Sequence, residues 1–295
     1  MGDKIGATNR LIPILVLAVG VMCISTGSIF ARLADAPALV KSAYRVGIAS
    51  LVFIPAALAY HRDEFRRLTR RDVCVTMLSG MFLSLHFAAW ISSLDYTTVA
   101  SSVILCNTIP IWIAVVNIAL GRGRPGRTMW ISILLSVTGA CIVGYGDMSF
   151  DRNALFGDAL ALVGAIGGAV YIMCGAESRK KLSLTAYAAL CYGFSAVVLF
   201  CAVLLAGCPL TGYAPSTWGA FAGLALMSQV LGHSSYNWAL GYFSAGFIAI
   251  MLLGEPLGSS ILAFLLFREM PTAMKLAGCA ILMASIVLAA RSEQK

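Results

Sequence analysis

A single acidic residue, Glu255, lies inside a run of apolar residues long enough to cross a membrane. Ionisable side chains at membrane depth cost about 2.5 to 3.5 kcal/mol each on insertion scales, so they usually face a cavity or a partner. A carboxyl group in that position can bind a cation or exchange a proton with a substrate. It can equally serve as a structural hydrogen-bond acceptor beside Pro256, because a proline leaves a carbonyl of the preceding turn without its partner.

Two histidines, His86 and His233, lie in further apolar stretches, and each has polar neighbours at helical spacing. Trp90 follows His86 by four residues, while Gln229 and Asn237 flank His233 at the same spacing, so each set would share one face of a helix. Histidine titrates near neutral pH and could relay protons. Alternatively, both histidines could only join helices through hydrogen bonds, which contribute about 1 kcal/mol in membranes.

Asn107 completes the set of candidate substrate-binding residues. Its amide both donates and accepts hydrogen bonds, and the ring of Trp90 could stack on an aromatic group or hold a cation. The candidate site comprises His86, Trp90, Asn107, Gln229, His233, Asn237 and Glu255. With one buried acid and, on this interpretation, no central lysine or arginine, the site should prefer zwitterionic or cationic amines, including amino acids, over phosphorylated or dicarboxylate anions.

These residues belong to a chain whose composition is that of a membrane protein. Of its 295 residues, 60% are hydrophobic and 12% are charged, and lipid permits only helices or closed barrels as spanning structures. The segments lack the alternation of barrel strands, so we predict an all-α membrane protein with ten transmembrane helices. The predicted spans are 11–31, 38–60, 73–94, 98–120, 128–145, 155–176, 184–206, 218–238, 243–267 and 272–290.

The second half of the chain repeats the first at an offset of 146 residues. At that offset LDY at 94–96 aligns with LGY at 240–242, and IP at 109–110 aligns with EP at 255–256. Five spans in each copy give the two copies opposite orientations, as in many secondary transporters. We therefore predict two inverted five-helix repeats, one at 1–147 and the other at 148–295.

Positive charges gather on one side of the predicted membrane. Fifteen of the 21 lysines and arginines fall in the termini and in loops on the side of the N-terminus, with five arginines between 62 and 71. By the positive-inside rule we expect both termini to be cytoplasmic, and the expected location is the plasma (inner) membrane. The basic loop at 61–72 is interpreted as a topology anchor, and nucleic-acid binding is not expected despite the net charge of +8.

No motif indicates a cofactor or a metal. The nine cysteines are scattered singly without a CxxC pair, so we expect them to pack like small apolar residues. No GxxxxGK(S/T) phosphate loop occurs, hence no ATP is expected. Small residues instead predict close helix contacts: Gly164 with Gly168, and a face of Ser132, Ser136 and Gly139 that could pack inside the chain or form a homodimer.

Two stretches of the sequence are similar to a known family. HFAAWISSLDYTTVASS at 86–102 with NTIP at 107–110, and GEP at 254–256 with LFRE at 266–269, resemble EamA-type carriers of the drug/metabolite transporter superfamily. The resemblance implies a secondary carrier with a cavity between two five-helix bundles, which moves a small organic metabolite outward without ATP. It also matches Arg45 to an arginine that recurs in the second helix of the family, and we expect this side chain to extend to the outer surface without a substrate role.

We therefore expect a secondary active exporter of small organic metabolites such as amino acids or amines, working by alternating access, with proton coupling through Glu255 as an option. It is not expected to be an enzyme. The alternatives are a channel, a membrane receptor or an intramembrane aspartyl protease, because GYGD at 144–147 matches the GxGD pattern of such proteases. That chemistry needs two aspartates at membrane depth, and beside Asp147 the other candidate, Asp95, falls in a predicted turn outside the membrane.

Overall fold

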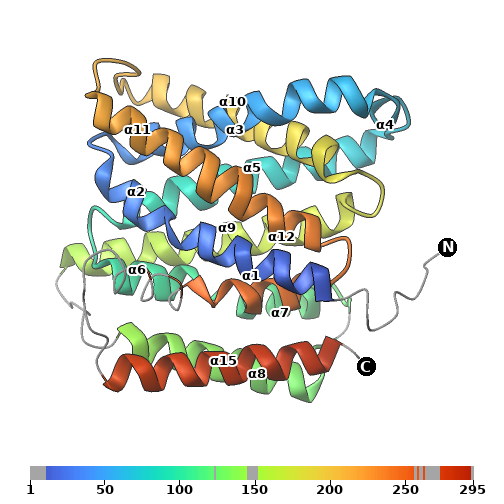
Figure 1. Ribbon diagram of the computed structural model, residues 1–295, viewed down its shortest axis with the longest axis vertical. Helices are drawn as coiled ribbons and strands as arrows, with labels where there is room; N and C mark the ends of the chain where they lie inside the picture. Colours follow the sequence, from blue (N-terminus) through green and yellow to red (C-terminus); the bar gives the residue numbers. More distant parts are fainter. Residues whose placement is uncertain are drawn as a thin grey trace.

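The computed structural model describes residues 11–122, 124–144, 152–255, 258, 262 and 273–293. All secondary-structure elements in these ranges are helices, arranged as a bundle (Figure 1). They are α1 (Leu11–Ser25), α2 (Gly27–Leu33), α3 (Ala38–Tyr60), α4 (Arg62–Arg66), α5 (Arg70–Ser93), α6 (Val99–Cys106), α7 (Ile109–Ala119), α8 (Arg127–Gly144), α9 (Arg152–Ser178), α10 (Leu184–Leu205), α11 (Pro215–Gly223), η3 (Leu224–His233), α12 (Ser234–Ala239), α13 (Ala245–Leu252) and α15 (Ala273–Glu293). Asp147, Pro256 and residues 266–269 lie outside the described ranges.

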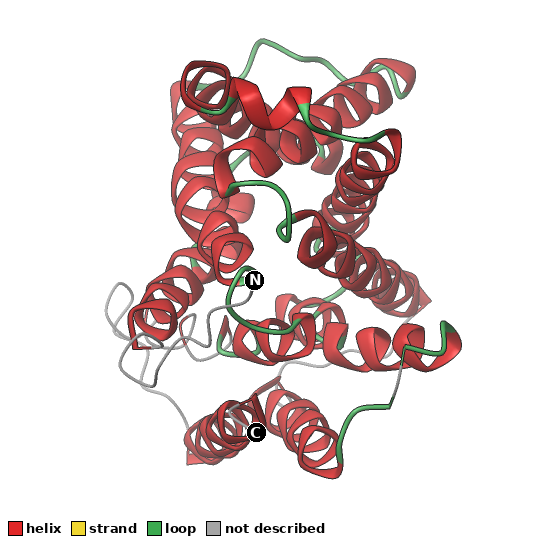
Figure 2. Cartoon of the chain, turned by 90° about the vertical axis from the view of Figure 1, so that its right-hand side faces the viewer, coloured by secondary structure: helices red, strands yellow, loops and turns green. Residues whose placement is uncertain are grey.

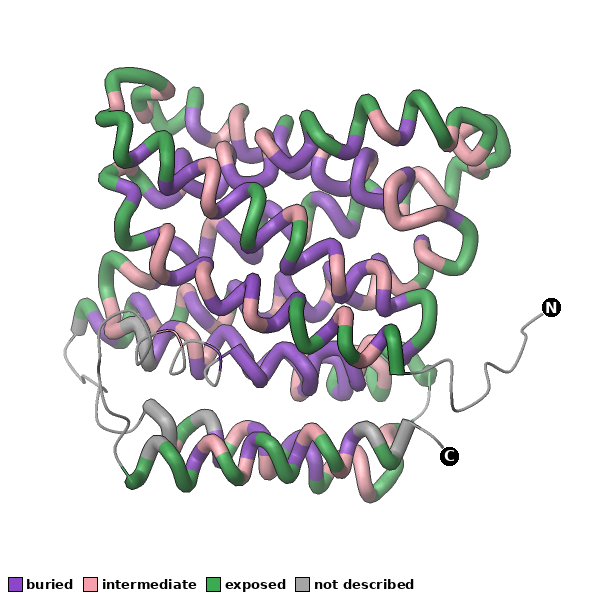
Figure 3. Tube along the Cα trace, viewed as in Figure 1, coloured by how far each residue is buried: buried purple, intermediate pink, exposed green. Residues whose placement is uncertain are grey.

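Six helical segments in the described part of the chain are long and apolar enough to cross a membrane: Leu11–Leu33, Ala38–Tyr60, Arg70–Ser93, Ser101–Ala119, Asn153–Ser178 and Leu184–Leu205. Large apolar side chains cover the outside of the bundle, including Leu51, Leu134 and Leu205, which are 72%, 63% and 90% exposed. The buried residues follow the inner faces of the helices (Figure 3). The chain is therefore an all-α multi-pass membrane protein whose apolar surface faces lipid.

Helices far apart in the sequence pack in pairs: α3 with α10, α5 with α9, α1 with η3, and α8 with α15. The pair of α8 and α15 forms a separate layer, visible in Figures 1 and 2, and contacts the rest of the bundle through α6 and α13. Ser136 Oγ donates a hydrogen bond to Ser285 Oγ at 2.9 Å, and a Cβ on Gly139 would lie 3.0 Å from the Gly278 oxygen. This face of small residues thus packs inside the chain.

Positions 146 residues apart have the same local structure in α6 and α13. Thr98 Oγ1 accepts a hydrogen bond from the Ser101 N–H at 3.1 Å, and Ser244 Oγ accepts one from the Phe247 N–H at 3.2 Å, so both helices begin at a side-chain cap. Both helices also end early, α6 at Cys106 and α13 at Leu252. The start of α1, the short α4 and the end of α15 lie at one end of the bundle (Figure 1).

The eighth predicted span is continuous, but its middle section is a π-helix, η3, between α11 and α12. A π-helix pairs residues i and i+5 and often marks a functional site. Accordingly, Ser234 Oγ donates a hydrogen bond to the main-chain oxygen of Gln229, five residues earlier, at 3.2 Å. The polar residues predicted on this span therefore lie in or beside a stretch with π-helical geometry.

Candidate substrate site

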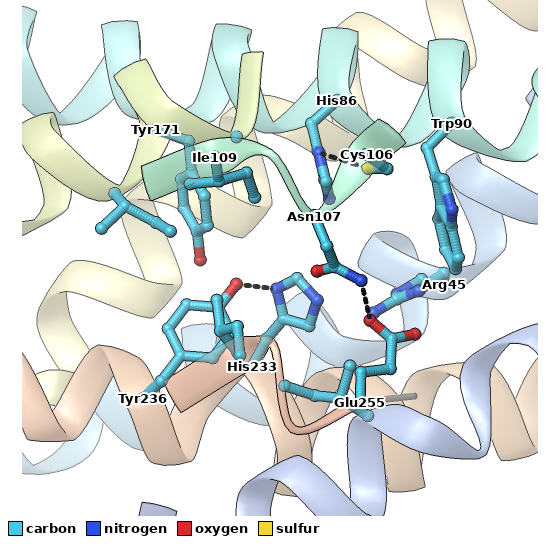
Figure 4. A pocket seen from close by; sticks show the side chains of 14 residues that line it. Arg45, His86, Trp90, Cys106, Asn107, Ile109, Tyr171, His233, Tyr236 and Glu255 are labelled. Carbon is cyan, nitrogen blue, oxygen red and sulfur yellow. Dashed lines mark hydrogen bonds between the residues drawn. The ribbon is translucent and has the colours of Figure 1, made fainter. Parts of the chain in front are cut away.

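A cavity lies beside the break between α6 and α7. It contains about 500 Å³ of space not filled by protein atoms, including its opening, and Figure 4 shows the surrounding side chains. Both halves of the chain contribute to the lining, which consists of Ile24, Arg45, His86, Trp90, Cys106, Asn107, Ile109, Gly168, Tyr171, Ile172, His233, Tyr236, Leu252 and Glu255. Five of the seven candidate residues are among them: His86, Trp90, Asn107, His233 and Glu255.

Glu255 is buried against Asn107 at this cavity. Asn107 Nδ2 donates to Glu255 Oε2 at 3.4 Å, whereas Glu255 Oε1 has no hydrogen-bond partner among the described residues. The Glu255 main-chain oxygen accepts a hydrogen bond from Ser25 Oγ at 3.1 Å, which ties this position to α1. Ile109, which aligns with Glu255 at the 146-residue offset, lines the same cavity. The carboxylate is thus a feature of one half only, and within the described chain one of its oxygens is unbonded.

Arg45 is 1% exposed and lines the cavity, so the expectation that it extends to the outer surface is wrong. Its Nε donates to Gln229 Oε1 at 2.9 Å, and its guanidinium carbon lies 4.0 Å from the centroid of the Phe87 ring. These partners stabilise the charge inside the bundle. Within the described ranges, Nη2 has no hydrogen-bond partner. The premise that the site has no central cation is also wrong.

Arg45 and Glu255 reach the cavity from α3 and from the residues that follow α13. In Figure 4 the guanidinium, the Asn107 amide and the carboxylate lie on the same side of the cavity. None of the ion pairs found within 4.0 Å in the described chain joins Arg45 to Glu255. A negative and a positive group therefore share one cavity, and each has a polar atom that no described residue binds.

The rings of His86 and His233 lie next to each other at the cavity, with centroids 6.4 Å apart. His86 Nδ1 lies 2.8 Å from the Gly164 oxygen, and because a carbonyl only accepts, Nδ1 donates and Nε2 is left for other partners. His233 Nδ1 forms a hydrogen bond with the Tyr236 hydroxyl. His86 thus joins α5 to α9, and His233 bonds to a residue one turn later. Both histidines also line the cavity.

Glycines of α9 allow α5 to approach closely. A Cβ on Gly164 would lie 3.3 Å from the Trp90 main-chain nitrogen, and one on Gly168 would lie 3.0 Å from His86 Nδ1. A side chain at Gly164 would press on the α5 backbone, and one at Gly168 would meet the side chains of His86 and Ile109. The Trp90 ring is stacked nearly parallel to the His86 ring, at 10° with centroids 6.3 Å apart, and both rings line the cavity.

Gln229 and Asn237 do not line the cavity, although the sequence predicted them on the face of His233. Gln229 instead supports Arg45, and Asn237 Nδ2 donates to the hydroxyls of Tyr171 and Tyr192 at 2.7 and 2.8 Å. These hydrogen bonds hold both amides away from the cavity. Both residues support the site from behind.

Sequence reasoning missed Tyr171 and Tyr236, which line the cavity with their rings 6.3 Å apart. Nothing in the local sequence distinguishes them from aromatic residues of the core. The repeat did indicate one further lining residue, Ile109. It aligns with the buried Glu255 at the 146-residue offset, and both residues line the same cavity. In the described chain, no group of three or more His, Cys, Asp or Glu side chains could hold a metal ion.

The helical bundle, its lipid-facing surface and its polar central cavity define a multi-pass membrane protein with a site for a small molecule. The model of the EamA-like transporter family matches residues 11–145 and 155–291. The chain belongs to this family and therefore to the drug/metabolite transporter superfamily. It is a membrane transporter and not an enzyme. The aspartyl protease alternative is thereby excluded, and Asp95 is exposed in the turn after α5.

Its relatives include proteins of bacteria, archaea and plants. The chain is 28% identical to an uncharacterized transporter of Archaeoglobus fulgidus over 72% of this chain and 74% of that protein. It is 23% identical to the inner membrane protein YtfF of Escherichia coli, over 87% and 88% of the two chains. The UDP-galactose/UDP-glucose transporter 7 of Arabidopsis thaliana matches at 24% over 43% of this chain and 38% of its own. A crystal structure with 16% sequence identity has the same fold, with a TM-score of 0.78 over 96% of this chain and 97% of that chain.

Proposed function

We propose that this transporter is a secondary carrier of small zwitterionic metabolites such as amino acids, which bind in the central cavity and cross by alternating access. The observation that carries the proposal is a pair of polar atoms in one cavity that have no hydrogen-bond partner among the described residues, Arg45 Nη2 and Glu255 Oε1. A carboxylate can accept from Arg45, and an ammonium group can donate to Glu255. A ligand with both groups satisfies two buried polar atoms that otherwise lack partners.

This substrate class is narrower than the class expected from sequence. A simple amine would leave Arg45 unsatisfied, and a simple carboxylate would leave Glu255 unsatisfied. A sugar phosphate or nucleotide sugar would place two negative charges near one arginine and a carboxylate, which repels them. The plant relative is named for UDP-sugar transport, but this charge balance favours zwitterions here.

The architecture proposed for this carrier is a pair of inverted five-helix repeats with ten transmembrane helices. Its support comes from the matching caps and helix ends of α6 and α13 at the 146-residue offset. The paired helices also map onto one another at that offset: α3 corresponds to α10, α8 to α15, and the pair of α5 and α9 to the pair of η3 and α1. Movement of one repeat against the other would open the cavity to each side in turn.

We further propose that both termini are cytoplasmic in an inner membrane and that the carrier works as an exporter with protons coupled through Glu255. The orientation rests on the arginines of the α4 region and of the loop after α7, which lie at the end of the bundle where α1 begins. Reporter fusions at Arg66 and Arg124 should give a cytoplasmic signal, and a fusion near Tyr213 should give an external one. An external signal at Arg66 would refute the orientation.

A ligand panel tests the substrate class directly. Purified transporter in uncharged detergent is heated with one of four kinds of compound: an α-amino acid, the amine without its carboxylate, the carboxylic acid without its amine, and a hexose phosphate. A ligand that binds only the folded state raises the apparent Tm. The proposal predicts that amino acids raise the Tm and that neither single-charge analogue does so at equal concentration. A larger rise with the amine alone or with hexose phosphate would contradict it.

A further inference from the structure

A second cavity lies between α7, α8 and the start of α13, at the end of the bundle where α4 lies. It contains about 690 Å³ of space not filled by protein atoms, including its opening. Its lining consists of Pro110, Ile113, Ala114, Asn117, Arg122, Arg124, Pro125, Met129, Ile133, Ser244, Ala245 and Gly246. Pro110 is the neighbour of Ile109, which lines the central cavity, so the two cavities are separated by the start of α7.

The wall of this cavity is apolar and its rim is basic. Ile113, Ala114 and Ile133 are each 2% exposed and form part of the wall. Arg122 and Arg124 are exposed and belong to the loop that follows α7. The cavity therefore combines an apolar interior with two positive charges at one edge.

A tight backbone turn after α7 places Arg122 at the edge of this cavity. Gly121 has a φ of 64°, a conformation that glycine adopts at helix ends without steric cost. The turn is closed by a hydrogen bond from the Arg122 N–H to the Asn117 oxygen at 2.9 Å. It returns the chain across the end of α7, where both Asn117 and Arg122 line the cavity.

Neither arginine of the rim has an ion-pair partner within the described ranges, unlike the lysines of the α9–α10 loop at the same end of the bundle. Lys180 pairs with Glu177 at 2.5 Å, and Lys181 pairs with Asp72 at 2.7 Å. Arg122 acts on Glu177 only from beyond ion-pair distance, so both rim arginines can still form a direct hydrogen bond with an anion. In a lipid-embedded helical protein, anionic phospholipids supply phosphate at the membrane surface and acyl chains below it.

We propose that this cavity binds an anionic phospholipid of the adjacent leaflet, with its phosphate on Arg122 and Arg124 and an acyl chain along Ile113 and Ile133. Guanidinium groups bind phosphate through charge-assisted hydrogen bonds, and the apolar wall excludes a fully hydrated anion from the interior. The bound lipid joins α7, α8 and α13 next to Pro110. This site is independent of the substrate proposed above.

Gly246 offers a test that leaves both charges in place. It lines the cavity, and a Cβ built on it meets no other atom within 4 Å. Leucine at this position would extend into the cavity from an unobstructed Cβ, and leucine is a better helix former than glycine. Gly219 on α11 also has open space around its Cβ position, outside the cavity, so Gly219→Leu is the matched control.

The experiment measures the apparent Tm of the full-length transporter in uncharged detergent after addition of dioleoyl phosphatidylglycerol, dioleoyl phosphatidylcholine or inorganic phosphate. Phosphatidylglycerol should raise the Tm of the wild type by on the order of 5 °C more than phosphatidylcholine does. Gly246→Leu and the double variant Arg122→Gln, Arg124→Gln should lose this difference. Gly219→Leu and a second charge control, Arg62→Gln with Arg67→Gln, should retain it.

Three results would overturn the proposal. The first is an unchanged phosphatidylglycerol effect in Gly246→Leu, which remains decisive if the double arginine variant does not fold. The second is an equal loss in both double arginine variants, because general surface charge would then explain the effect. The third is equal stabilisation by inorganic phosphate, which would assign the site to a free anion.

Discussion

Replacing Arg45 by glutamine should remove the recognition of the substrate carboxylate. In the wild type Nη2 has no partner among the residues that the structure describes, so it can donate a charged hydrogen bond to a ligand at this buried position. A hydrogen bond to a charged group contributes about 1.5 to 3 kcal/mol, which corresponds to about 10- to 150-fold in Kd. We expect Arg45→Gln to weaken amino-acid binding by this factor.

The folded state should tolerate this change. The variant loses the bond to Gln229 at 2.9 Å and the contact with the Phe87 ring at 4.0 Å. It also no longer buries a charge, and this gain opposes the two losses. Gel filtration and the apparent Tm would check that the variant is folded before any binding is measured.

Isothermal titration calorimetry would compare the best-binding amino acid of the ligand panel with its carboxamide, which lacks the negative charge. The wild type should prefer the acid by about 10- to 150-fold, and Arg45→Gln should bind both compounds equally. Arg32→Gln removes an equal charge from an exposed position and should leave the preference intact. If the acid remained preferred in Arg45→Gln, the assignment of Arg45 to the carboxylate would be refuted.

Three further predictions concern coupling, packing and stacking. Glu255→Gln should abolish uptake driven by a pH gradient while substrate exchange continues in proteoliposomes, because the amide retains the shape and loses the proton exchange. Gly80→Ala should destabilise the fold by about 1 to 3 kcal/mol and lower the Tm, since its Cβ would lie 2.6 Å from a backbone oxygen; Gly219→Ala, with open space, should not. Trp90→Ala should weaken substrate binding by about 2- to 10-fold through the lost ring contact, whereas Trp130→Ala, outside the cavity lining, should have little effect.

Each of these predictions has an outcome that contradicts it. Gradient-driven uptake unchanged in Glu255→Gln would move proton coupling to another group, with His86 or His233 next. A Tm of Gly80→Ala equal to that of Gly219→Ala would show that α5 and α10 can separate at no cost. Full affinity in Trp90→Ala would remove the ring from the site.

The helices of this chain could be predicted from sequence because lipid leaves few alternatives for long apolar segments. The expected span 184–206 corresponds to α10, and 38–60 corresponds to α3. The π-helix could not be predicted, since its residues have ordinary apolar spacing and its geometry depends on tertiary contacts with α1 and α3. Gln229 and Asn237 lie outside the cavity lining because they bond to Arg45 and to the hydroxyls of Tyr171 and Tyr192, and no local pattern indicates these partners.

Five of the seven candidate residues predicted from the sequence line the cavity, but the charge predicted for the site was wrong because Arg45 also lines it. Residues that are rare at membrane depth, such as Glu255 and His233, were informative because burial of such groups requires a reason. Arg45 was misjudged because snorkelling to the surface is the usual explanation for an arginine about two turns inside a span. Its actual stabilisation comes from Phe87 and Gln229. These lie 42 and 184 residues away in the chain, so no local pattern could have indicated them.

The central claim is that the cavity carries a zwitterion by alternating access, and a counterflow measurement tests it most directly. Proteoliposomes containing the transporter are loaded with an unlabelled amino acid from the panel and diluted into a trace of the same compound carrying a radioactive label. A carrier exchanges bound substrate, so the account predicts that labelled amino acid accumulates transiently above its equilibrium level, and that Arg45→Gln and carboxamide substrate both abolish this overshoot. Entry of label only down its gradient, without an overshoot, would indicate a channel and contradict the account.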